Sequence, residues 1–577
     1  MTQGKGQSLV LAQAANRLHA RLSGLARSST GFQSQPEPRT IGLFARGRQM
    51  IAGNFLFAGS LVEAPGLSLW DIAVPDHAFE AELQGFGWLD DLAAVGDSAA
   101  RMRAQDWTWG WIDRFSTGRG PGWTPNLTGR RVIRWINHAV LLLNGRDRTQ
   151  ADAYFRSLSR QTEFLSRRWK AADPGLPRIE ALTGLIYAGL SLTGMERHVQ
   201  RARVALAEEC ARDIAEDGSI PSRNPEELLE IFTLLSWATL ALSETGRRPE
   251  PAQTAAIERI APTLRALRHA DGGLARFHGG GRGLEGRLDQ ALASSGVKPA
   301  GAPTGMAMGF ARMSGGRTSV IIDAAAPPDD RYAATAHAST LAFELTSGRR
   351  PLIVSCGSGL PFGPDWRRAG RATVSHSTLS LDGYSSSRFD PSGQERLIDR
   401  AEVFDGQIVS RPSGTSFGAA HDGWSRTHGL THVRRIDLSH DGRRMVGEEL
   451  LVAESPAEQK RFEQVMTHTK LAGVRFQIRF HLHPDVDAAL DLGGTAISLA
   501  LKSGELWIFR HTSGAELRIE PSVYLEKGRL KPRATRQIVL AGHAQDRETR
   551  IGWTLAKAQD TPLAIRDLDR EDLASMS

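Results

Sequence analysis

The spacing of apolar residues changes along the chain. From about residue 95 to about residue 295, apolar positions recur every three or four residues, which is the period of an amphipathic helix. The segment 225–242 is apolar on nearly every side, which is typical of a helix inside a layered bundle. We therefore predict a toroid of paired helices, with helices over 130–143, 178–192, 196–214, 225–242 and 251–267.

The spacing at which apolar residues recur becomes shorter after a stretch rich in glycine and proline between Gly279 and Gly309. Short β-branched and aromatic runs follow, separated by turn pairs such as Asp382-Gly383. Helices followed by strands, without alternation, favour separate domains. The β-rich runs cover 318–323, 340–345, 351–355, 377–381, 474–480 and 505–509.

These patterns predict a multidomain α+β fold, in which an N-terminal (α/α) toroid precedes a C-terminal antiparallel β-sandwich. We expect residues 1–60, which include Pro36 and Pro38, to form an irregular lead-in. The toroid is predicted over 61–295 and the sandwich over 303–577.

Composition narrows the class of protein. The chain has 577 residues, 41% of them hydrophobic and 23% charged, which is typical of a globular protein. The two cysteines are too few for a disulfide framework. No apolar run reaches the roughly 18 residues that span a bilayer, and the N-terminus lacks the apolar core of a signal peptide. A cytoplasmic location is therefore one expectation.

The net charge of +7 comes with many arginines, whose planar forks suit carboxylate and sulfate groups. An acidic polymer is a reasonable partner. The charge is spread too thinly along this length to indicate a nucleic acid.

Several strings resemble the heparinase II/III-like family, whose members are polysaccharide lyases with an (α/α) toroid and a β-sandwich. The resemblance implies cleavage of an acidic, uronate-containing polysaccharide such as a glycosaminoglycan by β-elimination, and a location in the bacterial cell envelope or periplasm. The strings begin at Trp88, Arg134, Asp217, Ala336 and Arg371.

The chain departs from the family pattern where metal and proton-transfer groups are expected. Thr335, Ser339 and Ser355 stand where some members have metal ligands, so His337 and His376 alone make a poor zinc site. We predict no metal and no other cofactor. The family's tyrosine and histidine on the toroid side are replaced by Glu227 and Leu228.

Four residues remain as candidates for proton transfer: His337, His376, Tyr332 and Glu227. Imidazole titrates near neutrality and suits a general base. Packing is the alternative role for each ring. The substring Asn224-Pro225-Glu226-Glu227 also has the pattern of a helix N-terminus with Asn224 as its cap.

The candidate substrate-binding residues are mostly basic or amide side chains. Arg223 and Asn224 lie at a predicted helix start, where an anion can bind. Arg134 and Asn137 share one helix face, which we otherwise expect to be solvated. The full set is Arg223, Asn224, Arg134, Asn137, Glu180, Arg367 and Arg371.

Three functions stay open. The first is a lyase in which His337 and His376 face Arg223 across one cleft. The second is a non-catalytic or divergent glycan-binding protein of the cell envelope. The third is a glycoside hydrolase on the same scaffold, with Glu180, Glu226 and Glu227 as candidate carboxylates.

Overall fold

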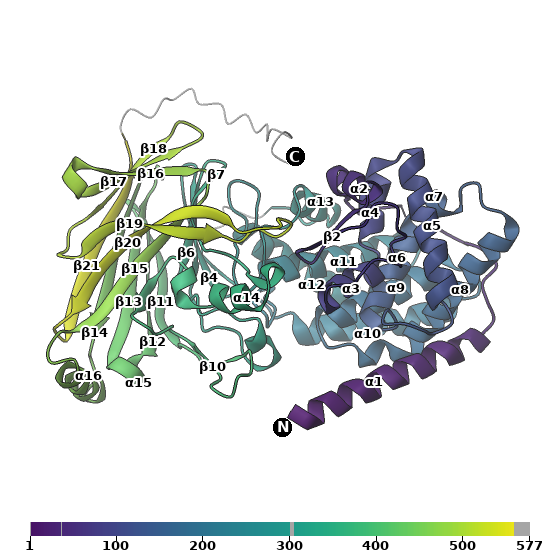
Figure 1. Cartoon of the computed structure of the whole chain (residues 1–577), viewed down its shortest axis with the longest axis horizontal. Helices are drawn as coiled ribbons and strands as arrows, with labels where there is room; N and C mark the ends of the chain where they lie inside the picture. The colour runs from purple at the N-terminus through teal and green to yellow at the C-terminus, as the bar shows by residue number, and fades with distance from the viewer. Residues whose placement is uncertain (1, 36, 300–304, 559–577) are drawn as a thin grey trace. The chain divides into compact units, whose positions relative to one another are not determined.

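The computed structural model describes residues 2–35, 37–299 and 305–558. It divides into two compact units that interleave along the chain (Figure 1). Unit 1 comprises Met1–Gly218, Leu229–Ala261 and Asp289–Val297, and unit 2 comprises Ser219–Leu228, Pro262–Leu288 and Lys298–Ser577. Residues 303–304 and 559–577 of the predicted sandwich lie outside the described residues.

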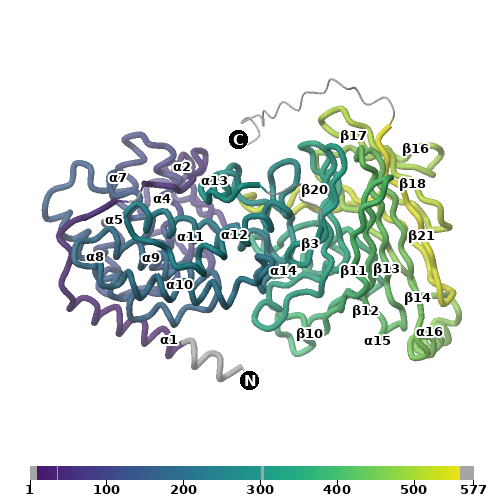
Figure 2. The backbone as a smooth tube through the Cα atoms, turned by 180° about the vertical axis from the view of Figure 1, so that it is seen from behind, coloured from purple at the N-terminus to yellow at the C-terminus, as the bar shows by residue number. Residues whose placement is uncertain are grey.

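Unit 1 consists of packed helices and one hairpin of β1 (Asn54–Phe57) and β2 (Ser60–Glu63). Helix α9 packs against α6, α8 and α10, and Figure 2 shows α8, α9 and α10 near one another. The helices are α1 (Thr2–Leu22), α2 (Phe44–Ile51), α3 (His77–Gly85), α4 (Trp88–Val95), α5 (Ser98–Phe115), α6 (Pro125–Asn137), α7 (Ala139–Leu143), α8 (Arg148–Arg168), α9 (Leu176–Ser191) and α10 (Val199–Asp213). Three more have residues in both units: α11 (Pro225–Glu244), α12 (Pro251–Ala266) and α13 (Arg287–Ser294).

Two glycines let α6 and α9 approach closely. A Cβ atom on Gly129 of α6 would lie 2.2 Å from the backbone oxygen of Glu180, and one on Gly184 of α9 would lie 2.6 Å from the Cα of Gly129. No side chain fits at either position without moving a helix. The polar residues of α6 are therefore held close to those of α9.

Two expectations for the helical part differ from the structure. The segment 1–60 is not irregular throughout, because α1, α2, β1 and β2 lie within it. Val10, Leu11 and Leu18 of α1 are exposed, so this helix lacks the buried apolar stripe that marks a helix in a sequence. The predicted helix 130–143 is two helices, since the backbone departs from helical geometry at His138.

Unit 2 contains two large antiparallel sheets, besides the pair β9 (Arg388–Phe389) and β10 (Leu397–Asp399). One sheet has the order β19-β20-β15-β7-β6-β5-β4-β3, with β8 also paired to β15, and the other β11-β12-β13-β14-β21-β18-β17-β16. The first comprises β3 (Gly305–Ala307), β4 (Phe310–Gly315), β5 (Thr318–Asp323), β6 (Phe343–Ser347), β7 (Arg350–Val354), β8 (Leu379–Leu381), β15 (Val474–Leu482), β19 (Glu516–Tyr524) and β20 (Arg533–Ala544). The second comprises β11 (Val403–Arg411), β12 (Gly414–Trp424), β13 (Leu430–Ser439), β14 (Arg444–Val452), β16 (Val486–Asp491), β17 (Ala496–Leu501), β18 (Leu506–His511) and β21 (Glu548–Lys557).

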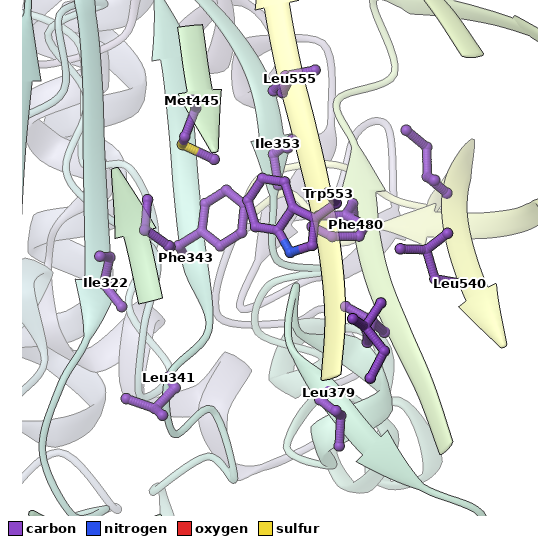
Figure 3. Close-up of a cluster of buried hydrophobic side chains, with 14 of the residues drawn as sticks. Ile322, Leu341, Phe343, Ile353, Leu379, Met445, Phe480, Leu540, Trp553 and Leu555 are labelled. Carbon is purple, nitrogen blue, oxygen red and sulfur yellow. The ribbon is translucent and has the colours of Figure 1, made fainter. Parts of the chain in front are cut away.

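The inner faces of these sheets form one apolar core (Figure 3). Phe343 and Phe480 come from the first sheet and Trp553 from the second. The rings of Phe343 and Trp553 are stacked, with centroids 5.9 Å apart and planes at 6°. The predicted sandwich is confirmed. Three short helices complete the unit: α14 (Pro364–Gly370), α15 (Ser425–His428) and α16 (Pro456–His468).

Among the described residues, every helix is too short or too polar to cross a membrane.

Candidate functional site

A buried acidic residue, Asp323 at the end of β5, organises a polar cluster in unit 2. Arg223 Nη2 lies 2.5 Å from its carboxylate, and His278 Nε2 lies 3.4 Å from it. The hydroxyl of Ser339 donates to the same carboxylate at 2.6 Å. Burial alone would raise the pKa of Asp323, but Arg223 and His278 outweigh it and hold this pKa well below its usual range. Asp323 is therefore a charged centre inside the unit.

Every N–H group of the Arg223 guanidinium has a protein acceptor. Nε donates to the carbonyl of Met308 at 3.1 Å, and Nη1 donates to the carbonyls of Ala325 and Ala326 at 3.2 and 2.7 Å. Nη2 donates to the Gly309 carbonyl at 2.9 Å and to Asp323 at 2.5 Å. A guanidinium has five N–H donors. Arg223 thus ties the segment before α11 to β4 and β5, and it has no N–H left for a substrate carboxylate.

Three histidines continue the cluster. The backbone N–H of His337 donates to Nδ1 of His278 at 3.2 Å, so the proton of His278 is on Nε2, toward Asp323. The ring centroids of His337 and His376 are 5.3 Å apart. Burial lowers the pKa of His337 well below its ordinary value and that of His376 to about 3. Both rings are neutral and enclosed, not exposed at an open cleft.

The position of a family metal site is occupied by a poor set of ligands. Nδ1 of His376 lies 3.1 Å from the hydroxyl of Ser355, which stands where a carboxylate ligand is expected. Zinc takes three or four ligands from His, Cys, Asp and Glu, and a serine hydroxyl is a weak substitute. No group of three such side chains is close enough to hold a metal anywhere in residues 2–35, 37–299 and 305–558. These residues do not fit zinc.

The start of α11 is capped as its sequence predicts. Oδ1 of Asn224 accepts hydrogen bonds from the backbone N–H groups of Glu226 and Glu227, at 3.0 and 3.2 Å. Glu226 forms an ion pair with Lys527 and accepts from the N–H of Gly281 at 2.8 Å. Lys527 and Gly281 overcome the effect of burial and lower the pKa of Glu226, so this carboxylate is a poor proton donor.

Glu227 is half-buried, and burial raises its pKa against the opposing effects of Ser222 and Arg331. The guanidinium of Arg331 lies over the ring of Tyr332, 4.8 Å from the centroid. A carboxyl group of raised pKa, a cation and a phenol are therefore close in the chain's fold, and each is at least partly accessible.

The other predicted arginines of unit 2 bind backbone. Arg371 is buried and donates to the carbonyls of Ala333 and Ala336, both at 2.8 Å. Arg367 donates to the Ala334 carbonyl at 3.0 Å. Together they hold the loop that carries Tyr332 and leads to His337.

A second polar cluster lies in unit 1, where α6 and α9 pack together. Arg130, Arg134 and Asn137 are spaced along one face of α6, and Glu180 and Thr183 share a face of α9. We call these five residues the α6–α9 face. Nε of Arg130 lies 2.5 Å from Glu180, and Nε of Arg134 lies 3.3 Å from Asp90 of α4.

Several polar atoms of the α6–α9 face have no hydrogen-bond partner among the described residues. They are both amide atoms of Asn137, Oε2 of Glu180 and the hydroxyl of Thr183. Asn137 is only 2% exposed. Burial raises the pKa of Glu180, although Arg130 opposes this. The expected solvated face of α6 is wrong: its polar residues point inward.

Asp323, His278, Arg130 and Asp90 were not predicted from the sequence as site residues. Asp90 stands inside the Trp88 string that carries the resemblance, so a signal was present. Asp323 and Arg223 are 100 residues apart. No local pattern relates two such positions.

Comparisons with known proteins agree with this fold. Residues 297–554 match the family model described as heparinase II/III-like, C-terminal. The chain belongs to the heparinase II/III-like family.

One relative is FtsZ-localized protein C of Caulobacter vibrioides (strain NA1000 / CB15N), which is 30% identical over 546 residues, or 92% of this chain and 91% of the relative. The crystal structure of heparinase III has a TM-score of 0.65 at 12% identity, over 96% of this chain and 90% of that chain. A mutant of heparan sulfate lyase HepC from Pedobacter heparinus has a TM-score of 0.59 at 14% identity, over 96% and 89%. The helical toroid followed by a sandwich is thus the fold of polysaccharide lyases.

Proposed function

We propose that the chain binds an acidic polysaccharide at the α6–α9 face and is a divergent member of its family that does not eliminate through Arg223 and His337. The observation that carries this proposal is the buried amide of Asn137, which has no hydrogen-bond partner among the described residues. A buried amide without a partner costs about 1–3 kcal/mol of stability. A ligand recovers this loss when the surrounding side chains move to admit it, because Asn137 is enclosed in the unbound structure.

The chemistry of the α6–α9 face suits a saccharide. An amide and a hydroxyl donate to and accept from sugar hydroxyls, and the carboxyl of Glu180 adds a further group with a free oxygen. Arg130 and Arg134 lie on the same helix face as Asn137 and place positive charge beside it, although each also forms an ion pair, with Glu180 and Asp90 respectively. Two structures of similar fold are titled heparinase III and heparan sulfate lyase, which favours an acidic chain.

The geometry of unit 2 argues against the predicted elimination mechanism. β-Elimination needs a group that neutralises the uronate carboxylate and a base that removes the adjacent proton. All five donors of Arg223 are bound to protein acceptors. A base with a pKa of about 3, such as His376, accepts a proton weakly at neutral pH.

β-Elimination by other residues is the second candidate. The raised pKa of Glu227 favours it, because burial increases the protonated fraction of this carboxyl at a given pH, and a protonated carboxyl can protonate a leaving oxygen. Tyr332 would be the base and Arg331 the group that faces the uronate carboxylate. Under this candidate, Glu227→Gln abolishes turnover.

The test is a binding and cleavage assay with heparan sulfate, chondroitin sulfate and polygalacturonate, with an uncharged chitin oligosaccharide as comparison. Calorimetry measures binding, and ultraviolet absorbance of an unsaturated uronate reports elimination. Binding of an acidic chain without new absorbance is the expected result. New absorbance supports the second candidate, and the absence of binding to all three acidic chains contradicts the proposal.

Variants locate the binding site. Glu180→Gln and Asn137→Leu should weaken binding at least tenfold, since about 1.4 kcal/mol corresponds to a factor of ten. Arg444→Gln, an exposed position on β14, is the control and should bind like the unmodified chain. Equal affinity of all three variants would place binding elsewhere.

The location of the chain is also a proposal. The family resemblance suggests the cell envelope or periplasm, whereas the name of the 30% identical relative suggests a place with FtsZ. Imaging of a fluorescent fusion together with labelled FtsZ separates the two. Overlapping signals would support the second location, and a signal that surrounds the cell independently of FtsZ would support the first.

A further inference from the structure

A small pocket in unit 2 is not part of either cluster described above. It lies where the chain after α12 meets β6, β7 and β19, and the empty space within it and at its mouth is about 330 Å³. Its charged and aromatic polar lining includes His269, Asp271, Arg276, Arg282, Glu344 and Tyr524.

Arg276 is the central cation of this pocket, and it is held firmly. Its Nη2 donates to the carbonyls of Cys356 and Leu525, at 3.0 and 3.1 Å. The guanidinium carbon lies 4.0 Å from the ring centroid of Tyr524, close enough for a cation–π contact. A Cβ on Gly357 would lie 1.9 Å from Nη2, so a larger residue at Gly357 would displace the guanidinium.

One nitrogen of this guanidinium is not used. Arg276 is 7% exposed, and its Nη1 is buried with no hydrogen-bond partner among the residues the structure describes. Nε2 of His269, which also lines the pocket, has no hydrogen-bond partner either, although it lies 3.5 Å from Glu344. Nδ1 of His269 lies 3.1 Å from the Ser319 hydroxyl. If that hydroxyl donates, Nε2 carries the ring proton and is a donor.

The carboxylates that line the pocket already have donors of their own. Glu344 accepts from the backbone N–H groups of Arg276 and Ser355, at 3.0 and 3.3 Å. Asp271 accepts from the N–H of Gly273 at 2.9 Å and lies 3.5 Å from Arg282. The side chain of Arg276, in contrast, hydrogen-bonds only to carbonyls in the described part of the chain. Glu344 lies near this charge, and although burial alone would raise its pKa, His269 and Arg276 lower it. No carboxylate accepts a hydrogen bond from the Arg276 guanidinium in the described part of the chain.

We propose that this pocket binds an oxyanion, which is a carboxylate, sulfate or phosphate group. Nη1 of Arg276 and Nε2 of His269 are its donors, and charge-assisted bonds of this kind are about twice as strong as neutral ones. The oxyanion is either a free ion or a group carried on a saccharide. The proposal does not depend on polysaccharide binding at the α6–α9 face, because the two sites share no residue.

The test is calorimetric titration of the full chain with sodium sulfate, sodium phosphate and a sulfated disaccharide, with ionic strength kept constant by sodium chloride. Saturable binding of at least one of them is expected. Binding of free sulfate or phosphate identifies an ion site, and binding of the disaccharide alone identifies a subsite for a saccharide. The absence of binding by all three overturns the proposal.

Two variants assign the binding to this pocket. Arg276→Gln removes the charge, and His269→Asn keeps an atom near the Nδ1 position but removes Nε2. Each should weaken oxyanion binding at least tenfold, while Arg444→Gln leaves it unchanged. If far-ultraviolet circular dichroism shows that Arg276→Gln fails to fold, the His269→Asn variant alone tests whether the oxyanion binds in this pocket. Oxyanion affinity that stays the same in His269→Asn, or in a folded Arg276→Gln, contradicts the proposal. Loss of oxyanion binding with unchanged polysaccharide affinity separates this site from the α6–α9 face.

Discussion

The two units each place an arginine beside a buried carboxylate, Arg223 beside Asp323 and Arg130 beside Glu180, but the surroundings of the two pairs differ. In unit 2, Arg223 has an acceptor for all five N–H groups, and Asp323 has three partners. In unit 1, the α6–α9 face leaves both amide atoms of Asn137 and one oxygen of Glu180 unpaired. The contrast concerns Arg223 itself, because Nε2 of His278, Nδ1 of His337 and Nε2 of His376 in the same unit 2 cluster also have no hydrogen-bond partner among the described residues.

This difference distinguishes a structural role from a binding role. A buried ion pair with full hydrogen bonding fixes the position of chain segments, and removing one partner is strongly destabilising. Buried polar groups without partners lower stability, and each calls for an explanation such as an ordered water, an ion or a role in function. We therefore interpret Arg223 as a structural arginine and the α6–α9 face as the proposed binding surface. The following predictions test this difference, from the largest effect to the smallest.

Arg223→Gln should destabilise unit 2 by about 3–5 kcal/mol, because it leaves the buried charge of Asp323 without its main counter-charge. Urea unfolding measures the loss. Polysaccharide affinity should remain unchanged under conditions where the variant is folded. The exposed Arg444→Gln should change stability by less than about 0.5 kcal/mol. A stable Arg223→Gln variant that has lost polysaccharide binding would reverse the assignment.

Acid should destabilise the sandwich through Glu449, which is buried beside Arg434 and His432. Burial alone would raise the pKa of Glu449, but Arg434 and His432 lower it to about 2, against 4.5 ordinarily. Because the folded pKa is the lower one, the stabilisation is complete above about pH 4.5 and is lost as the pH falls toward 2. The total loss is about 3 kcal/mol.

Unfolding between pH 5 and pH 2 measures this effect. Glu449→Gln should flatten the pH dependence, whereas Glu548→Gln, an exposed position on β21, should leave it unchanged. The same slope in both variants would assign the acid sensitivity to another group.

Gly129→Ala should destabilise unit 1 by about 1–3 kcal/mol, because its Cβ would lie 2.2 Å from the backbone oxygen of Glu180 and push α6 from α9. The same displacement separates Arg130 from Glu180, so polysaccharide affinity should fall as well. Thermal unfolding and calorimetry measure the two effects. Gly31→Ala is the control, since no atom lies within 4 Å of its Cβ. Equal behaviour of both variants would show that the close approach of these helices is unimportant.

The fold could be predicted from the sequence where apolar residues recur regularly within one helix or strand. The predicted segments 178–192, 225–242 and 251–267 correspond to α9, α11 and α12, and 318–323 is β5. Boundaries failed where a single residue redirects the backbone. Leu341 has a φ of +59°, so β6 begins at Phe343 and not at residue 340.

The candidate site was predictable only in part. Asn224 was recognised as a helix cap because capping depends on neighbours in the chain. The period of α6 shows that Arg134 and Asn137 share a face, but it cannot show that this face meets Glu180 of α9 and Asp90 of α4. The hydrogen bonds that occupy the guanidinium of Arg223 go to carbonyls that are at least 85 residues away in the sequence. Tertiary packing determines both the partners of the α6 face and those of Arg223.

Asn137→Leu tests the central claim most directly, with unfolding free energy and polysaccharide affinity measured on the same preparation. Leucine has a similar size and no polar atoms, so the substitution removes the unpaired amide without opening a cavity. The account predicts a free energy of unfolding that is equal to or up to about 2 kcal/mol above that of the unmodified chain, with affinity at least tenfold weaker. Lower stability together with unchanged affinity would contradict it, because Asn137 would then be a structural residue and the α6–α9 face would not be the binding surface.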